Sequence, residues 1–384
     1  MRFSCLSPKA YLLGALVGLA RFVFADCECG YSVNPTDERD HTLFTDILES
    51  DFTTLKDIRA DKDWVLQEWK IDKSVSRGPY GRMTVPGNAI SNPAKDLAVS
   101  DEGVLGREAG LELYVRKLQP GDQYVSIVEA DSYRADMIYG SFRAGIKTTG
   151  ISGTCGAFFW YLNDTQEIDI EFLSSQLNDT TSPVNLVLHS SLSKGGDASG
   201  TPTFKVIQLP FEADKAVHEY RFDWQPHRVS FYADGQWLTD MTEEEYIPSV
   251  PGKIILSHWS NGNKLWSGGP PIEDAFMLVQ YVKAYFNTSS EERMKDYAVR
   301  CKNSSASNAI CEVPDQNGPP IFGGNDPSQR PYFFSQDASK NKTVNQTYGK
   351  VESTNKNAAT PLLAISGYAV LTMAILLAAI LEVM

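Results

Sequence analysis

The sequence predicts an all-β domain, a sandwich or a barrel, because it holds many short apolar or alternating runs and no long amphipathic helix. The runs recur roughly every ten residues between residues 41 and 290, and Gly, Pro, Asn and Asp separate them. The chain has 384 residues, which is enough for one large β-domain with tails. Representative runs are 111–115, 124–128, 157–162, 184–188, 228–232 and 276–282.

Both ends of the chain have the composition of targeting segments. Residues 1–25 begin with Met-Arg and continue with a short apolar run, which predicts a signal peptide cleaved near Ala25. Residues 361–384 are apolar and no Lys or Arg follows them, which favours a cleaved glycolipid (GPI) anchor signal over a tail-anchored helix. Ser353 and Asn357 are candidate attachment points. Residues 301–360 predict a glycosylated stalk, because their later part has little aliphatic content.

Charge and glycosylation motifs indicate a secreted protein with an uncharged ligand. The net charge is −13 and no basic cluster stands out, which argues against a nucleic-acid partner. A neutral sugar polymer fits better. We expect the protein at the cell surface, anchored to the plasma membrane or held in the cell wall. N-glycans are expected at six Asn-x-Ser/Thr motifs, namely Asn163, Asn178, Asn287, Asn303, Asn341 and Asn345.

Five cysteines remain after removal of the signal peptide, and an odd number cannot all pair within the chain. Cys301 and Cys311 are close enough in sequence for a local bridge. Cys27 and Cys29 are expected to pair elsewhere, one of them with Cys155. The spacing does not fix the connectivity.

The most informative motif is Glu-Ile-Asp-Ile-Glu-Phe, which begins at Glu167. Alternation along a strand puts Glu167, Asp169 and Glu171 on one face and the apolar residues on the other. A solvated outer strand would show the same pattern. Two observations favour a catalytic site. Three like charges on one face repel one another and reduce stability unless they serve a function. The aromatic run 158–161, which could stack on sugar rings, also precedes them.

The spacing also suits a glycosidase that retains the anomeric configuration. The α-carbons of Glu167 and Glu171 lie about 13 Å apart along a strand, and two glutamates that lean together can bring their carboxyls to about 5–5.5 Å. One carboxylate would then attack the anomeric carbon, and the other would act as acid and base. Metal catalysis is poorly supported, because the five histidines show no ligand spacing.

The sequence resembles the laminarinase and lichenase group, glycoside hydrolase family 16, whose hallmark is Glu-x-Asp-x-Glu. Further similarity lies in 139–147, 156–160, 218–224, 229–235 and 266–271, so that the resemblance spans about residues 110–285. It implies a concanavalin-like β-jelly-roll of two curved antiparallel sheets, with a catalytic domain that we place at residues 26–300. It also implies retaining cleavage of β-1,3 or mixed β-1,3/1,4 glucan without a cofactor, although some members bind a structural calcium. We expect this cleavage to be internal to the polymer.

The resemblance gives the carboxylates their roles: Glu167 is the nucleophile, Glu171 the acid/base, and Asp169 the group that tunes both. Candidate substrate-binding residues are Trp160, Trp259, Trp266 and His189, each of which could instead be an ordinary packing residue. Two rival functions remain open. A cell-wall transglycosylase would share the first half of the mechanism, and a lectin-like surface protein would bind glycan on the same sheet without chemistry.

Overall fold

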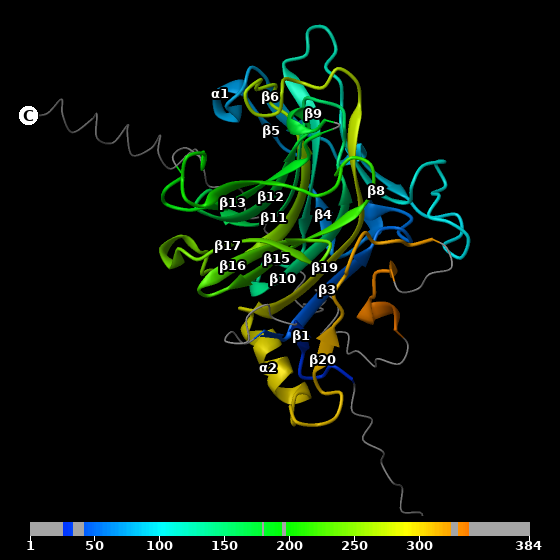
Figure 1. Cartoon of the computed structure of the whole chain (residues 1–384), viewed down its shortest axis with the longest axis vertical. Helices are drawn as coiled ribbons and strands as arrows, with labels where there is room; N and C mark the ends of the chain where they lie inside the picture. Colours follow the sequence, from blue (N-terminus) through cyan, green and yellow to red (C-terminus); the bar gives the residue numbers. More distant parts are fainter. Residues whose placement is uncertain (1–25, 34–41, 179, 194–196, 324–328, 338–384) are drawn as a thin grey trace, which may run out of the picture.

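The computed structural model describes residues 26–33, 42–178, 180–193, 197–323 and 329–337. Two large sheets face each other across one hydrophobic core (Figure 1), which confirms the predicted all-β jelly-roll sandwich. The predicted signal peptide, the attachment points of the anchor, the segment 361–384, Asn341 and Asn345 lie outside the described residues. Within the described part of the chain, no helix has the length and apolar character needed to cross a membrane.

The first sheet has nine strands and carries the Glu-Ile-Asp-Ile-Glu motif on its third. Its order is β14-β13-β12-β11-β18-β9-β6-β5, with β4 also paired to β9. In that order the strands are Phe204–Gln208, Pro183–His189, Gln166–Leu173, Cys155–Asn163, Lys253–Trp259, Tyr124–Ser132, Gly81–Thr84 and Lys70–Ile71, and β4 is Trp64–Leu66.

The second sheet has eight strands and forms the back of the sandwich. Its order is β17-β16-β15-β10-β19-β8-β7, with β3 also paired to β19. In that order the strands are Gln236–Met241, Arg228–Ala233, His218–Gln225, Met137–Lys147, Ala275–Thr288, Gly110–Val115 and Ala89–Asn92, and β3 is Asp46–Asp51.

Helices are short and lie outside the two sheets. They are η1 Ile58–Ala60, α1 Lys73–Ser76, η2 Pro86–Asn88, η3 Ser174–Gln176, η4 Glu244–Tyr246, α2 Glu291–Arg300 and η6 Phe334–Gln336.

The core between the sheets explains the alternating pattern of the sequence. Ile168 and Ile170 of β12 point into it with Phe158 of β11, and all three are almost completely buried. Trp160 and Trp224 meet across the core with ring centroids 4.4 Å apart. Large rings from both sheets thus interlock, and each buried aromatic side chain contributes about 2–3 kcal/mol by its removal from water.

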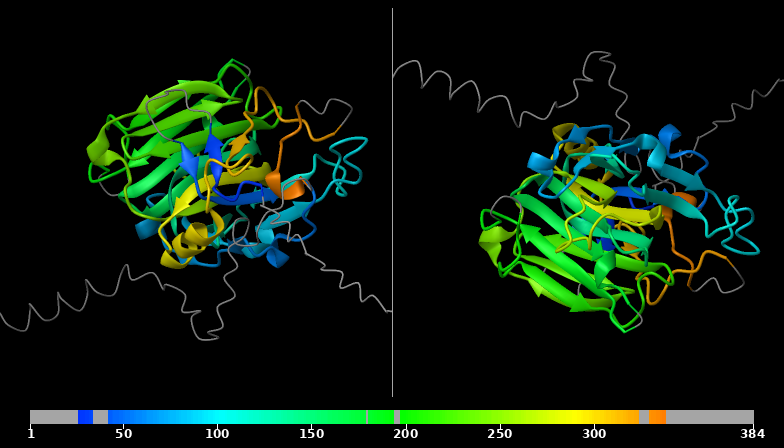
Figure 2. Two further views of the ribbon diagram at one scale, coloured as in Figure 1. Left: turned by 90° about the horizontal axis from the view of Figure 1, so that it is seen from below. Right: turned by 90° about the horizontal axis from the view of Figure 1, so that it is seen from above.

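A small three-stranded sheet, β2-β1-β20, joins the two ends of the domain. Its strands are Leu43–Phe44, Tyr31–Val33 and Cys311–Val313. With α2 it lies at the lower end of the molecule in Figure 1 and faces the viewer in the left view of Figure 2. The strand β20 runs parallel to β1, which brings residues far apart in sequence side by side.

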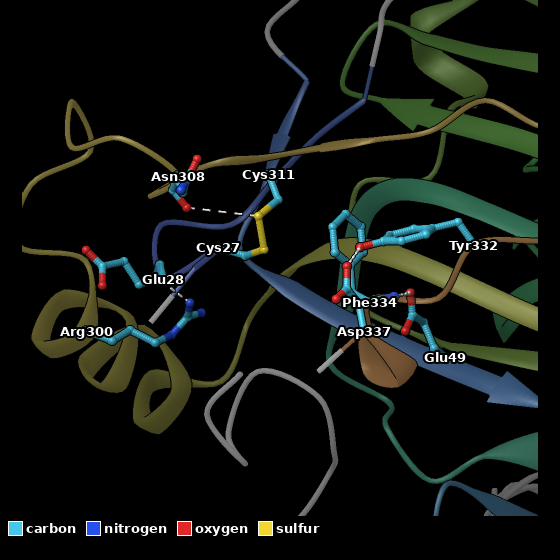
Figure 3. The surroundings of a disulfide bond; sticks show 9 residues. All are labelled: Cys27, Glu28, Glu49, Arg300, Asn308, Cys311, Tyr332, Phe334 and Asp337. Atoms are coloured by element: carbon cyan, nitrogen blue, oxygen red, sulfur yellow. Dashed lines mark hydrogen bonds between the residues drawn. A yellow bond between two sulfur atoms is a disulfide. The ribbon is translucent and has the colours of Figure 1, made fainter. Parts of the chain in front are cut away.

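The disulfides follow from this small sheet and differ from the prediction. Cys27 is bonded to Cys311 (Figure 3), and Cys29 is bonded to Cys301. The predicted local bridge between Cys301 and Cys311 is therefore wrong, because each of these residues pairs with the N-terminal segment. Cys155 is a buried free thiol, so its predicted pairing with Cys27 or Cys29 is also wrong.

Residues 311–323 and 329–337, here called the C-terminal strap, cover the outer face of the eight-stranded sheet. The sequence predicts stalk for these residues, yet Phe322 and Phe333 pack on Tyr281 of β19. The backbone N–H groups of Phe334 and Ser335 donate to the Glu49 carboxylate over 3.0 and 2.7 Å (Figure 3 shows Phe334 and Glu49). The folded domain therefore extends beyond the predicted boundary at residue 300.

Charged side chains beneath the strap are buried and paired. Lys283 lies 3.3 Å from Glu219, and the Arg221 guanidinium lies 3.0 Å from Asp315 of the strap. The Arg143 guanidinium donates to the Pro314 carbonyl over 3.1 Å. A buried charge without a partner lowers stability, so the strap is part of the folded domain because it supplies partners to these arginines.

Candidate active site

Strand β12 presents its three carboxylates on the face of the nine-stranded sheet that points away from the core, here called the carboxylate face. Asp169 stands between Glu167 and Glu171, while Ile168 and Ile170 fill the core behind them. Neighbouring strands continue the face, since Glu167 pairs with Tyr161 of β11 on one side. On the other side it pairs with His189 of β13. The alternation predicted from the sequence is thus present in the fold.

Burial governs the protonation of this trio. Removal from water raises the pKa of Glu167, Asp169 and Glu171 above their ordinary values. Asp169, only 3% exposed, is affected strongly, and the negative charges of Glu167 and Glu171 raise its pKa further. The carboxyl groups of Asp169 and Glu167 are hydrogen-bonded to each other, which stabilises ionised Glu167. Of these two carboxyls, Asp169 is therefore the one that keeps its proton and donates a hydrogen bond to Glu167.

His189 stands beside the trio as a neutral imidazole. Its Nε2 lies 3.4 Å from Asp169 Oδ2, but neither that oxygen nor His189 Nδ1 has a hydrogen-bond partner in the structure. Burial, followed by the charge of Arg77, lowers the pKa of His189 to about 4. The pair is thus a polar contact rather than an ion pair at neutral pH, and the neutral imidazole can both donate and accept a hydrogen bond.

Among the described residues, one group of His, Cys, Asp or Glu side chains could hold a metal ion: Glu167, Asp169 and His189, with ligand atoms within 4.8 Å of one another. Calcium takes about six to eight oxygen ligands. Two carboxyls and an imidazole, with one carboxyl protonated, do not fit that requirement. This group therefore does not match the structural calcium implied by the family resemblance.

The aromatic residues of β11 that reach the carboxylate face differ from the prediction. Phe159 lies opposite Asp169 and Tyr161 lies opposite Glu167, so both rings stand beside the carboxyls. Trp160 lies opposite Ile168, is fully buried, and donates its indole N–H to the Met137 carbonyl. Trp160 therefore cannot stack on a sugar, and the prediction for it is wrong because alternation turns it into the core.

Trp259 and Trp266, the other two predicted stacking residues, lie near the carboxylate face and are partly exposed. Trp259 is the last residue of β18 and pairs with Cys155 of β11. The Arg82 guanidinium lies 5.1 Å from the centre of the Trp259 ring. Trp266 belongs to the loop between β18 and β19, and its ring centre lies 6.4 Å from that of Phe204 of β14. These rings flank the trio on two sides.

Two charged features near the trio were not identified from the sequence. Arg77, in a left-handed conformation at the end of α1, is exposed, and its charge lowers the pKa of both Glu167 and Glu171. On β9, Glu129 accepts a hydrogen bond from the Trp69 indole over 3.2 Å, and Asp131 pairs with Lys253. Burial, then the charge of Asp131, raises the pKa of Glu129 to about 7. No motif marks these residues, because segments distant in sequence bring them together.

Residues 96–277 match the family model described as glycosyl hydrolases family 16. These residues belong to that family. The match runs from before β8 into β19 and includes every site residue predicted from the sequence.

The family 16 region resembles characterised β-glucanases. It is 33% identical over 155 residues to the β-glucanase of Bacillus subtilis (strain 168), which is 38% of this chain and 59% of that protein. The β-glucanase of Paenibacillus macerans is 35% identical over 162 residues, which is 39% of this chain and 62% of that protein. The chain thus spans about three fifths of the length of these relatives.

Similar solved structures include the Bacillus licheniformis β-glucanase, with a TM-score of 0.46 and 22% identity. That comparison covers 62% of this chain and 97% of the other. The apo Crh5 transglycosylase gives a TM-score of 0.45 and 18% identity, covering 64% of this chain and 86% of the other.

Proposed function

We propose that this chain is a retaining β-glycan hydrolase that cleaves β-1,3 or mixed β-1,3/1,4 glucan internally. The observation that carries the proposal is the alternating trio Glu167, Asp169 and Glu171, with raised pKa values and two flanking rings, inside the family 16 region. Groups with perturbed pKa values gather at catalytic sites. A solvated outer strand would instead leave its carboxylates near their ordinary pKa values.

In the proposed mechanism, ionised Glu167 attacks the anomeric carbon while protonated Glu171 donates its proton to the departing glycosidic oxygen. A covalent glycosyl-enzyme forms, and Glu171, now ionised, removes a proton from the attacking water. Protonated Asp169 donates a hydrogen bond to Glu167, which lowers the pKa of the nucleophile against the larger effect of burial and supports it again as a leaving group.

Several side chains would hold the substrate during these steps. Phe159 and Tyr161 offer apolar faces for sugar rings next to the reacting carboxyls. Neutral His189 can exchange hydrogen bonds with a hydroxyl without adding charge. No cofactor is needed, because the carboxyls supply both the nucleophile and the proton.

The proposal is tested with purified protein on β-1,3, mixed β-1,3/1,4 and β-1,4 glucans, by counting reducing ends and sizing the products. We expect oligosaccharides of several sugars, released with the β-configuration when followed by NMR during the first turnovers. Glu167→Gln and Glu171→Gln should each lower kcat/KM by about 10³-fold or more. Glu292→Gln, on the exposed start of α2, is the matched control and should behave as wild type.

Two results would contradict the proposal. Release of the α-configuration would exclude a covalent glycosyl-enzyme. Near-normal turnover by Glu167→Gln or Glu171→Gln would show that the carboxylate in question is not catalytic. A labelled oligosaccharide added as acceptor separates hydrolysis from transfer. Label that accumulates in products longer than the acceptor would instead favour a cell-wall transglycosylase.

The proposal includes the location of the protein at the cell surface. The apolar segments 1–25 and 361–384 support a secreted protein held at the cell surface by a lipid anchor. Among the described N-glycan motifs, Asn163, Asn178 and Asn303 are exposed and Asn287 is half-buried in β19. Treating cells with a phospholipase specific for the glycolipid anchor should release activity into the medium, and continued retention would contradict the anchor.

A further inference from the structure

Cys155 is a buried thiol that the proposed mechanism does not use. It begins β11, is fully buried, and is the one free cysteine among the described residues. Two residues further along β11, Ala157 lies directly opposite Glu171. Cys155 is therefore the diagonal neighbour of Glu171 on the carboxylate face, a position from which side chains of adjacent strands make contact.

The thiol lies between Glu171 and an aromatic residue of the neighbouring loop. Its Sγ is 3.4 Å from Glu171 Oε1 and donates a hydrogen bond to it. On its other side the sulfur lies near the side chain of Trp266, which lowers the pKa of the thiol in part. Trp266 is in turn held by Ser175, which donates to its carbonyl over 3.1 Å. The thiol thus lies between Trp266 and Glu171 and donates to the carboxylate.

We propose that Cys155 is a positioning residue for Glu171, which it holds by the thiol hydrogen bond. This inference rests on the proposed function, in which Glu171 is the acid/base. Ala157 is too small to restrain the glutamate directly opposite it, so the diagonal thiol supplies the restraint. A carboxyl that transfers a proton in both steps needs a fixed orientation, because a displacement of about 1 Å can cost about 10²-fold in rate.

The environment keeps Cys155 in the donor form. Burial raises the pKa of the thiol well above its ordinary value, and the charge of Glu171 raises it further. The other four described cysteines are bonded to one another, so none is left to pair with it. A thiol that stays protonated is a permanent donor to Glu171 and not a nucleophile.

The thiol also affects the proton affinity of Glu171. Burial raises the pKa of this carboxyl, and the hydrogen bond from Cys155 and then the charge of Arg77 lower it in part. Other polar groups face it from the same strand and from β13: Asp169, Glu167, His189 and Asn185. Loss of the thiol donor should therefore raise the pKa of Glu171, and the alkaline limb of the pH profile should move to higher pH.

The experiment compares Cys155→Ala with Cys155→Ser, because serine restores a donor and alanine does not. On glucan, Cys155→Ala should lower kcat by about 10-fold with little change in KM. Its alkaline limb should move upward by half a pH unit or more, and Cys155→Ser should recover most of both effects. On an aryl β-glycoside with a good leaving group, which needs little proton donation, the initial burst of aryl alcohol should stay near wild type.

A second set of variants separates positioning from packing. In the Glu171→Gln background, Cys155→Ala should have no further effect on kcat, since the group that it positions is already lost. Equal activity and equal pH profiles of Cys155→Ala, Cys155→Ser and wild type would overturn the inference while the proposed function stands. Absence of turnover by the wild-type protein on every glucan would overturn the proposed function, and the inference with it. Thermal midpoints confirm that each variant is folded.

Discussion

The two disulfides join the same two parts of the chain, so their contributions to stability should be strongly coupled. Cys27–Cys311 and Cys29–Cys301 both tie the start of the domain to its end. The informative perturbation removes each bridge as a pair of alanines, then both bridges together. Pairwise replacement avoids leaving a free thiol that could exchange with the remaining bridge.

The sequence separations set the magnitude. Either bridge alone spans 284 or 272 residues, and the loss of chain entropy in the unfolded state makes such a closure worth about 5 kcal/mol. Once one bridge exists, the second closes only a ring built from residues 27–29 and 301–311, roughly 14 residues, worth about 3 kcal/mol. Removing either bridge alone should therefore lower the free energy of unfolding by about 3 kcal/mol, and removing both should lower it by about 8 kcal/mol.

Urea unfolding followed by tryptophan fluorescence measures these differences as changes in the midpoint and slope. The double removal should exceed the sum of the single removals by about 2 kcal/mol, which is the coupling between the bridges. Cys155→Ala, which opens no loop, is the control and should cost no more than about 1 kcal/mol. A double removal that costs no more than the sum of the two single ones would refute the reasoning.

Two further predictions concern the carboxylate face. Phe159→Ala should raise KM for glucan about 10-fold with little loss of stability. Trp160→Ala should instead lower the free energy of unfolding by about 3–5 kcal/mol, because it leaves a cavity in the core. Kinetics and urea unfolding of both variants check this, and the reverse pattern would contradict it. Burial raises the pKa of Glu171 to about 7, so its ionisation reduces stability as pH rises from about 4.5 through 7. Glu171→Gln should therefore raise the melting temperature by about 3 °C at pH 8 and leave it unchanged at pH 4, and an equal shift at both pH values would exclude this cause.

The sequence predicted those parts of the site that depend on alternation within one strand. Glu167, Asp169 and Glu171 alternate with isoleucines, so the polar and apolar faces of β12 are unambiguous. The run Phe158 to Tyr161 is aromatic throughout, and its composition does not show which rings face the core. That choice depends on the register with β12, which shifts between Tyr161 and Asn163 at the turn.

The remaining errors came from contacts between distant segments. The cysteine pairs depend on the parallel pairing of β1 with β20, which no local spacing reveals. The sequence predicted a stalk for the strap because residues 301–360 as a whole have a polar composition, which hides a few apolar residues among them. Three phenylalanines within it, Phe322, Phe333 and Phe334, are almost completely buried and are enough to hold it against the sheet.

The C-terminal strap also decides from which side the later chain leaves the domain. It ends at Asp337, where the Gln336 amide donates to Asp51 of β3 over 2.7 Å, on the outside of the eight-stranded sheet. The carboxylate face is the outer surface of the other sheet. A long polysaccharide could therefore approach the carboxylates without crossing the strap. The sandwich thus keeps the carboxylates and the point where the described chain ends on opposite faces.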